Sequence, residues 1–197
     1  CRIRGRPEVH ALRLRADSSL LEVALAVSEA LEAAGIPAPL SGGAAMSLYT
    51  DNKYLTRDLD FVTSARGNDL KAVLEPLGFT AAPDGRHFVH EPSGWLVECP
   101  PGPVSFGDTF LSEDDIPITD YEQGRLRVIT PTQSLMDRLA AYFHWNRQPE
   151  LRTQVRQLVA TMDPRGGIDW PALYEWARQE GISANEIDEV CKRHEQG

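Results

Sequence analysis

Two aspartates separated by one residue form the most informative chemical pattern of the sequence. Apolar Leu59 and Phe61 alternate with Asp58 and Asp60, which predicts a strand with both carboxylates on one face. Residues two apart on a strand lie roughly 6.5 Å apart and point the same way. Carboxylates at that spacing can hold one divalent cation, or two cations about 3.5 to 4 Å apart as in phosphoryl-transfer enzymes. The pair is therefore a candidate metal site.

A glycine pair precedes these acids. Pro37 and Pro39 favour extended backbone, so we expect a strand over residues 38–41 and a short helix that begins at Ser41-Gly42-Gly43. Backbone amides at glycine can approach an anion closely, and a helix that starts there points its positive end at the anion. A Gly-Gly pair alone is more often a plain turn, and an isolated Asp-x-Asp is more often a solvated strand face. Their order and spacing favour a metal-dependent site for a triphosphate.

Two further residues extend this candidate site. Glu98 lies in a predicted strand from Trp95 to Cys99 between apolar neighbours, where an unpaired carboxylate would be costly. A metal shared with the two aspartates, a salt bridge or exposure at a sheet edge would each remove that cost. Arg57 directly precedes the aspartates, so it either binds a phosphate or pairs with one of them.

The order of these motifs resembles the nucleotidyltransferase superfamily, whose signature is Gly-Gly or Gly-Ser at a helix start, then Asp-x-Asp, then a third carboxylate on a later strand. The resemblance covers roughly residues 40–159. It implies an α/β or α+β fold, with a short mixed sheet flanked by helices and a helical C-terminal part. It also implies that Asp58, Asp60 and Glu98 hold Mg²⁺ or Mn²⁺, and that Ser41-Gly42-Gly43 holds the phosphates of an NTP.

A second set of residues narrows the resemblance. Thr130-Pro131-Thr132, followed by residues 137–142 (Asp-Arg-Leu-Ala-Ala-Tyr) and 144–146 (His-Trp-Asn), resembles small bacterial proteins related to the AbiEii-like toxins of toxin–antitoxin and phage-defence systems. This resemblance implies that Asp137 and Arg138 lie near the active site and that Arg138 contacts a phosphate. The structural alternative is that the two residues form an ion pair within the helix. Relatives often carry Lys immediately before the Asp, where this chain has Met136, so a lysine role does not carry over.

These features together predict a metal-dependent nucleotidyltransferase that moves a nucleoside monophosphate from an NTP to an acceptor hydroxyl. The resemblance favours RNA, with tRNA 3′ ends, as the acceptor, and implies a cognate antitoxin protein as partner. The alternatives are a catalytically idle, partner-binding member of the fold, a transferase that modifies a small molecule or a protein, and a metal-dependent phosphodiesterase.

The charge of the chain bears on the RNA hypothesis. A net charge of −9 argues against general affinity for polyanions. Two groups of arginines depart from this balance, and each is either a solvated face or a surface for RNA or the triphosphate. They are Arg2, Arg4, Arg6, Arg13 and Arg15 near the N-terminus, and Arg138, Arg147, Arg152 and Arg156 in a predicted helical region.

Composition and cysteine usage set the class of protein. The fractions of hydrophobic and charged residues, 42% and 25%, are those of an ordinary soluble protein. No apolar run approaches the roughly 20 residues of a membrane span, so we expect a cytoplasmic protein without a membrane partner. Cys1, Cys99 and Cys191 are odd in number and widely spaced, which implies neither a disulfide framework nor a zinc site. His87 and His90 fall on opposite faces of a presumed strand and are not expected to share a metal.

The remaining pattern predicts two regions, an α/β core over residues 1–130 and a helical region over residues 131–197. Capping boxes at Ser19 and Thr130 predict helices that begin there. The acidic run at residues 113–115 is expected to be a solvated loop. The other predicted helices span residues 68–74, 150–161, 170–179 and 184–194, and two hairpins pair residues 79–81 with 86–90 and residues 116–121 with 125–129.

Overall fold

The computed structural model describes residues 14–51, 56–145 and 147–191. Four sequence features therefore lie outside the described residues: most of the N-terminal arginine group with Cys1, most of the loop between residues 50 and 56, Asn146, and the predicted end of the last helix. Within the described part of the chain, no helix is both long and apolar enough to cross a membrane.

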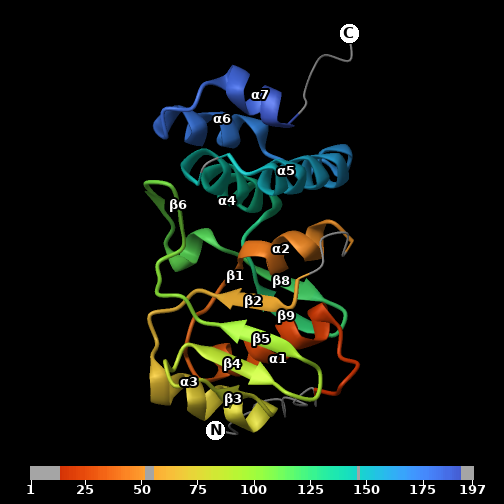
Figure 1. The fold of residues 1–197 in the computed structure, drawn as a ribbon, viewed down its shortest axis with the longest axis vertical. Coiled ribbons are helices and arrows are strands. Elements are labelled where there is room, and N and C mark those ends of the chain that lie inside the picture. The colour runs from red at the N-terminus through yellow and green to blue at the C-terminus, as the bar shows by residue number, and fades with distance from the viewer. Residues whose placement is uncertain (1–13, 52–55, 146, 192–197) are drawn as a thin grey trace, which may run out of the picture.

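A five-stranded mixed sheet forms the centre of the N-terminal half (Figure 1). Its strands lie in the order β1-β2-β5-β4-β3; the β2–β5 pair is parallel and the other three pairs are antiparallel. In β2, Leu59 and Phe61 are buried, whereas Asp60 is half-buried and Asp58 exposed, as the alternation in the sequence predicts. The strands are β1 (Leu40–Ser41), β2 (Asp58–Phe61), β3 (Thr80–Ala81), β4 (His87–His90) and β5 (Trp95–Glu98).

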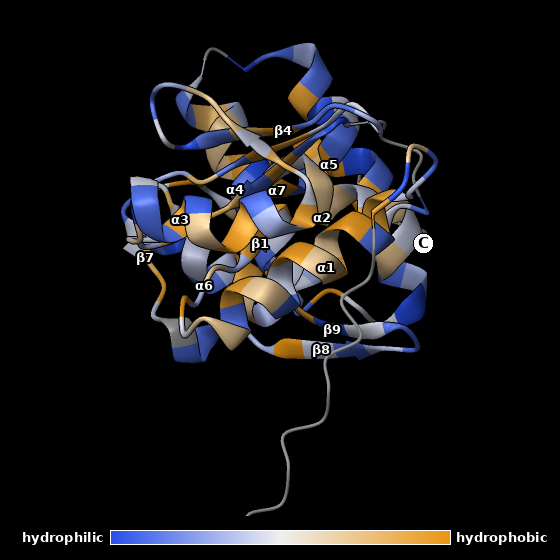
Figure 2. Ribbon diagram, turned by 90° about the horizontal axis from the view of Figure 1, so that it is seen from below, coloured by the Kyte–Doolittle hydropathy of each residue, from blue (hydrophilic) through white to orange (hydrophobic). Residues whose placement is uncertain are grey.

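Three helices accompany the sheet: α1 (Leu20–Ala33), α2 (Gly42–Tyr49) and α3 (Gly67–Leu74). The expected capping box of α1 is present, because Ser19 accepts from the amide of Glu22 and the Glu22 side chain accepts from the amide of Ser19. Apolar residues concentrate on α1 and α2 (Figure 2). The fully buried core joins these helices to the sheet and includes Leu25, Leu31, Leu40, Met46, Leu59, Phe61, Leu70 and Phe88.

A separate hairpin packs against α1. It pairs β8 (Ile118–Tyr121) with β9 (Gly124–Arg127), close to the predicted strands. Arg127 of β9 forms an ion pair with Glu32 of α1 over 2.6 Å. An isolated parallel bridge between Leu40 and Val128 then connects the end of this hairpin to β1.

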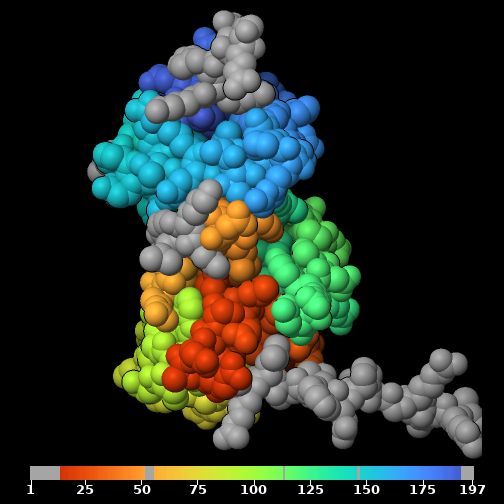
Figure 3. All heavy atoms as spheres, turned by 90° about the vertical axis from the view of Figure 1, so that its right-hand side faces the viewer, coloured from red at the N-terminus to blue at the C-terminus, as the bar shows by residue number. Residues whose placement is uncertain are grey.

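The C-terminal part is helical and packs on the α2 side of the core. In Figure 3 the orange residues of α2 lie beneath the cyan-to-blue residues of α5, and both α4 and α5 contact α2. The capping box of α4 is formed by Thr130 and Gln133, with Pro131 in the first helical position. The helices are α4 (Pro131–His144), α5 (Pro149–Met162), α6 (Trp170–Gln179) and α7 (Ala184–Cys191).

Most of the second arginine group has a structural use in this helical part. Arg147 pairs with Glu186 over 3.3 Å and Arg152 with Glu189 over 3.8 Å. Arg156 donates to the carbonyl of Val190. These bonds connect α7 to α5 and to the loop that precedes α5, which favours a structural reading of the group over an RNA-binding one.

Two local features differ from the expectation. The acidic run at residues 113–115 is a turn of 3₁₀ helix and not a plain loop, because Asp115 accepts from both the amide and the hydroxyl of Ser112 and so closes the chain on itself. A short hairpin of β6 (Ser105–Phe106) and β7 (Thr109–Phe110) was not predicted. Its turn is held by Glu180, which accepts from the Asp108 amide and the Thr109 hydroxyl.

Candidate active site

Four polar residues line up across four neighbouring strands. Ser41 of β1 is paired with Asp60 of β2, and Asp60 with Glu98 of β5. Glu98 is paired in turn with His87 of β4. Directly paired residues project from the same face of a sheet. The register therefore places a hydroxyl, two carboxylates and an imidazole in one row, with Asp58 two residues from Asp60 on the same face.

The first turn of α2 lies against the carboxylate of Asp60. Gly42 has a positive φ of +64°, and a Cβ on it would stand 2.2 Å from Oδ2 of Asp60. A side chain is therefore excluded there by both backbone conformation and space. Ser41 is the N-cap residue of α2, but its side chain makes no capping hydrogen bond to that turn. An anion bound to the first-turn amides would lie beside Asp60.

The electrostatics of Asp60 show which other groups lie close to it. Burial raises the pKa of Asp60 to about 6, and the negative charges of Glu98, Asp137 and Asp58 add to the rise. The positive charge of Arg138 opposes it. The fold thus brings the three predicted acids together with two residues of α4.

Asp137 and Arg138 form the ion pair that was the structural alternative for them. Nε and Nη2 of Arg138 lie 3.0 and 2.5 Å from Oδ2 of Asp137, and Nη1 lies 3.4 Å from Oε1 of Gln154. Both side chains are largely buried, with 15% and 18% of their surface exposed. Because the pair also influences the pKa of Asp60, it belongs to the surroundings of the site as well as to the helix.

Arg57 makes contacts on the other side of the site. Its Nη1 donates to the carbonyl of Ser93 over 3.3 Å, and its guanidinium lies 4.9 Å from the ring centroid of Trp95. These contacts keep the exposed guanidinium at the turn between β4 and β5, beside the start of β2 where Asp58 stands.

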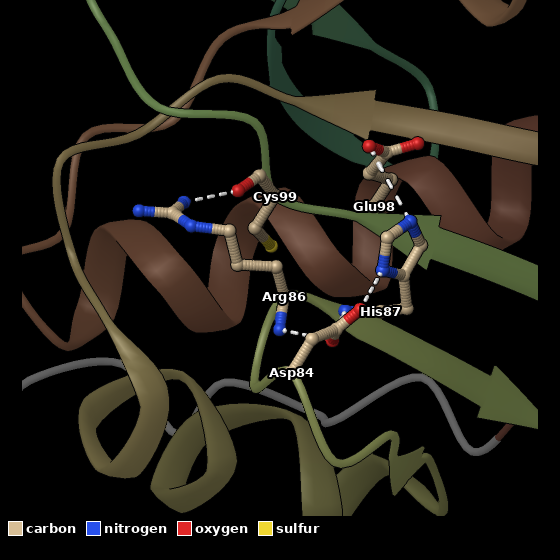
Figure 4. A network of polar contacts seen from close by, with 5 residues as sticks. All are labelled: Asp84, Arg86, His87, Glu98 and Cys99. Carbon is tan, nitrogen blue, oxygen red and sulfur yellow. Dashed lines mark hydrogen bonds and ion pairs between the residues drawn. The ribbon is translucent and has the colours of Figure 1, made fainter.

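Glu98 has a partner that the sequence analysis did not find. Nε2 of His87 lies 3.4 Å from Oε1 of Glu98, and Nδ1 lies 2.5 Å from Oδ2 of Asp84 (Figure 4). The hydrogen bond to Asp84 is the main reason why the pKa of His87 is raised. Hydrogen bonds from the amide of Arg86 and from His87 hold the pKa of Asp84 low, at about 2. The contact between His87 and Glu98 follows from the register of β4 against β5, and no local sequence pattern predicts it.

The residues of the row have the chemistry of a metal site. Throughout residues 14–51, 56–145 and 147–191, no group of three or more His, Cys, Asp or Glu side chains is arranged so that it could hold a metal ion. Asp60 and Glu98 nevertheless offer carboxylates on paired residues, and the exposed Asp58 lies two residues from Asp60 on the same face. The oxygen donors and the raised pKa of Asp60 fit a hard divalent cation such as Mg²⁺ or Mn²⁺.

Comparison with known proteins shows the fold. No family model matches the sequence, and no curated protein matches it. A crystal structure of an antigenic nucleotidyltransferase-like protein from Paracoccidioides brasiliensis is similar over 90% of this chain and 94% of that chain, with a TM-score of 0.57 and 14% sequence identity.

Two structures of ANT(2'')-Ia show lower similarity. The solution structure of this antibiotic-resistance factor covers 85% of this chain and 94% of that chain, with a TM-score of 0.47 and 14% identity. Its complex with adenylyl-2''-tobramycin covers 79% and 95%, with a TM-score of 0.46 and 15% identity. The similarity to the Paracoccidioides brasiliensis structure alone shows the fold of this chain, a mixed α/β fold of the nucleotidyltransferase-like type, as predicted from the sequence.

Proposed function

We propose that this chain is a metal-dependent nucleotidyltransferase, which transfers a nucleoside monophosphate from an NTP to an acceptor hydroxyl and releases pyrophosphate. The observation that carries the proposal is the contact between the first turn of α2 and Asp60, where a Cβ on Gly42 would stand 2.2 Å from the carboxylate. This contact supports a phosphate site beside a carboxylate that is suited to a cation.

The phosphates are assigned to the start of α2. The backbone amides of Gly42 and Gly43 and the hydroxyl of Ser41 provide donors there, and the positive end of the helix dipole adds to them. We assign Arg138 to a phosphate bound beside that carboxylate, and the support is that its positive charge lowers the pKa of Asp60. Arg57 is the corresponding arginine on the β5 side, next to Asp58.

Asp58, Asp60 and Glu98 would hold the metal. A bound Mg²⁺ or Mn²⁺ supplies positive charge to the triphosphate oxygens during transfer. Without a cation, the carboxylates of Asp60 and Glu98 repel each other, which is one cause of the raised pKa of Asp60. The negative charges of these carboxylates also repel phosphate, so cation and NTP are expected to bind together.

Glu98 is assigned the proton of the acceptor. The acceptor oxygen forms a bond to the α-phosphorus while its proton passes to a carboxylate oxygen of Glu98. The bond between the α-phosphorus and the oxygen that bridges to the β-phosphate breaks, and pyrophosphate leaves with that electron pair. Glu98 stands in the row directly after Asp60, on the side away from α2, which suits attack from opposite the leaving group.

For the acceptor, we propose RNA, with tRNA 3′ ends first, and for the biological role a toxin that a cognate antitoxin protein restrains. The support is the resemblance of residues 130–146 to AbiEii-like proteins. A small hydroxyl compound and a protein hydroxyl are the competing acceptors, and the experiment distinguishes them.

The test is a labelling reaction. The protein is incubated with Mg²⁺ or Mn²⁺ and each α-labelled NTP, together with total bacterial RNA or with tobramycin as a polyhydroxylated small acceptor. The Asp58→Ala/Asp60→Ala variant is the control. Label that appears in RNA only when both aspartates are present supports the proposed reaction and the proposed acceptor. Label in the small compound or in the protein itself supports the reaction but identifies a different acceptor.

Two results would contradict the reaction. Release of monophosphates from unlabelled RNA without consumption of NTP would indicate a phosphodiesterase. No transfer to any acceptor, with no Mg²⁺-dependent NTP binding by isothermal titration calorimetry, would indicate a catalytically idle member of the fold that binds a partner.

A further inference from the structure

Three side chains form a continuous chain of polar contacts that ends on Glu98, with a hydrogen bond between Asp84 and His87 and an ion-pair contact between His87 and Glu98. Asp84 lies in the turn between β3 and β4, His87 begins β4, and Glu98 ends β5. Nδ1 of His87 lies 2.5 Å from Oδ2 of Asp84, and Nε2 lies 3.4 Å from Oε1 of Glu98. Figure 4 shows the imidazole between the two carboxylates. No residue assigned above to phosphate, metal or proton transfer takes part in this chain except Glu98.

The turn fixes the outer carboxylate of this chain. Oδ1 of Asp84 accepts from the amide of Arg86 over 2.9 Å and from the amide of His87 over 3.1 Å. An aspartate that bonds to the backbone two residues ahead stabilises a turn in this way. Its other oxygen, Oδ2, is thereby directed at the imidazole. The backbone of the turn fixes Asp84, and Asp84 in turn fixes the orientation of His87.

We propose that Asp84 and His87 form a positioning pair, which fixes the carboxylate of Glu98 so that one oxygen faces the acceptor. The proposal rests on the function proposed above for Glu98. With Oε1 in contact with Nε2 of His87, Oε2 remains to face both the metal and the acceptor hydroxyl, whose proton it receives. A base that is held in its reactive orientation does not spend time in unproductive rotamers, which raises the rate of the chemical step.

The order of Ser41, Asp60, Glu98 and His87 across the sheet separates a nucleotide end of the site from an acceptor end. Ser41 and the first turn of α2 stand at one end, and His87 stands at the other, with Asp60 and Glu98 between them. The nucleotide is bound at the α2 end, so the acceptor approaches from the β4–β5 end. His87 and Asp84 are therefore expected to affect turnover and not the binding of the nucleotide.

A purely structural role of the pair is the competing explanation. The side chains of Asp84, His87 and Glu98 are 51%, 38% and 39% exposed, and exposed pairs contribute little to stability. The same strands are also connected without them, because the Cys99 amide donates to the carbonyl of Arg86 over 2.8 Å and the Arg86 guanidinium donates to the Cys99 carbonyl. Variants of His87 are thus expected to fold.

The kinetic test compares two substitutions of one residue in the full chain, with the acceptor that the labelling reaction identifies. His87→Ala is expected to lower kcat by about 10- to 100-fold, the usual effect of removing a group that orients a reacting ligand. KM for the NTP stays within about twofold, because the imidazole is at the acceptor end. His87→Gln, whose amide N–H can replace Nε2, restores most of kcat, and Asp84→Asn falls between the two.

The control for this series is Glu175→Gln, which removes another surface ion pair, 2.7 Å long and more exposed, with Arg178 on α6. It should leave kcat, KM and the melting temperature unchanged. A rise in KM for the NTP at constant kcat in His87→Ala, or no recovery in His87→Gln, would overturn the positioning role.

A spectroscopic readout tests the contact without any turnover. The side-chain ¹⁵N resonance of Nε2 of His87 is expected to shift in Glu98→Gln and that of Nδ1 in Asp84→Asn, as measured by NMR on the unliganded chain. Unchanged resonances overturn the pair. A wild-type protein that transfers nucleotide but is indifferent to His87→Ala overturns this inference alone, whereas a wild-type protein without transfer overturns the proposed function and this role with it.

Discussion

Gly42 and Asp60 touch in a way that leaves no room for a side chain: a Cβ on Gly42 would stand 2.2 Å from Oδ2 of Asp60. Gly42→Ala is therefore expected to displace the carboxylate and to strain a backbone whose φ is +64°. Strain of this kind costs an L-residue about 1 to 2 kcal/mol. The displacement of Asp60 should in addition abolish Mg²⁺-dependent binding of NTP, as measured by isothermal titration calorimetry.

Gly166→Ala is the matched control for this prediction. Gly166 has a φ of +66°, but a Cβ on it would meet nothing within 4 Å. It should show the loss of stability in a denaturation experiment without any loss of NTP binding. Equal binding losses in both variants would mean that the contact with Asp60 has no special role.

The raised pKa of Asp60 predicts a pH dependence of stability in the absence of metal. The pKa is about 6 in the folded chain against 3.8 for the free group. Between these values the folded state binds more protons than the unfolded state, so the stability contributed by this residue falls as the pH rises. A difference of about two pH units corresponds to at most about 3 kcal/mol.

Asp60→Asn removes this penalty, because an amide does not ionise. In EDTA the variant should be more stable than the wild type at pH 7.5, and the advantage should vanish near pH 4. Urea denaturation of both proteins across this range measures the difference. A difference that is constant with pH, or that has the opposite sign, would show that Asp60 ionises normally.

The local features of the fold were predictable because short-range chemistry determines them. Both capping boxes, at Ser19 and Thr130, use a partner three residues away, and the structure contains both. The alternation around Asp58 and Asp60 placed both acids on one face of a strand, which the burial pattern of β2 confirms. The hairpin β6–β7 was missed because its strands are two residues long and it depends on Glu180, distant in sequence.

The candidate site was predictable only in part, for the same reason. The carboxylates and the glycine pair could be predicted from their residue types and spacing. Pairing of His87 with Glu98 depends on the register of two strands, and the influence of Arg138 on Asp60 depends on how α4 packs. Neither relationship leaves a local signal, although the ion pair of Asp137 with Arg138 was one of two readings of adjacent residues.

Divalent metal should stabilise the folded chain through the same carboxylates. A ligand that binds the folded state alone stabilises it by about 2.7 kcal/mol at one hundred times its dissociation constant. Addition of MgCl₂ or MnCl₂ with an NTP is expected to raise the melting temperature of the wild type in differential scanning fluorimetry. Asp58→Asn and Glu98→Gln should each reduce this shift. An undiminished shift in both variants would place the metal elsewhere.

Arg138 has two assigned partners, a phosphate and Asp137, and a double substitution separates them. Arg138→Met leaves the largely buried Asp137 without its counter-charge, so the chain should lose roughly 3 kcal/mol of stability. Arg138→Met/Asp137→Asn removes both charges and should recover most of that loss in urea denaturation. The affinity for NTP should stay low in both variants if the guanidinium contacts a phosphate. Recovery of NTP affinity together with stability would instead show that Arg138 serves the ion pair alone.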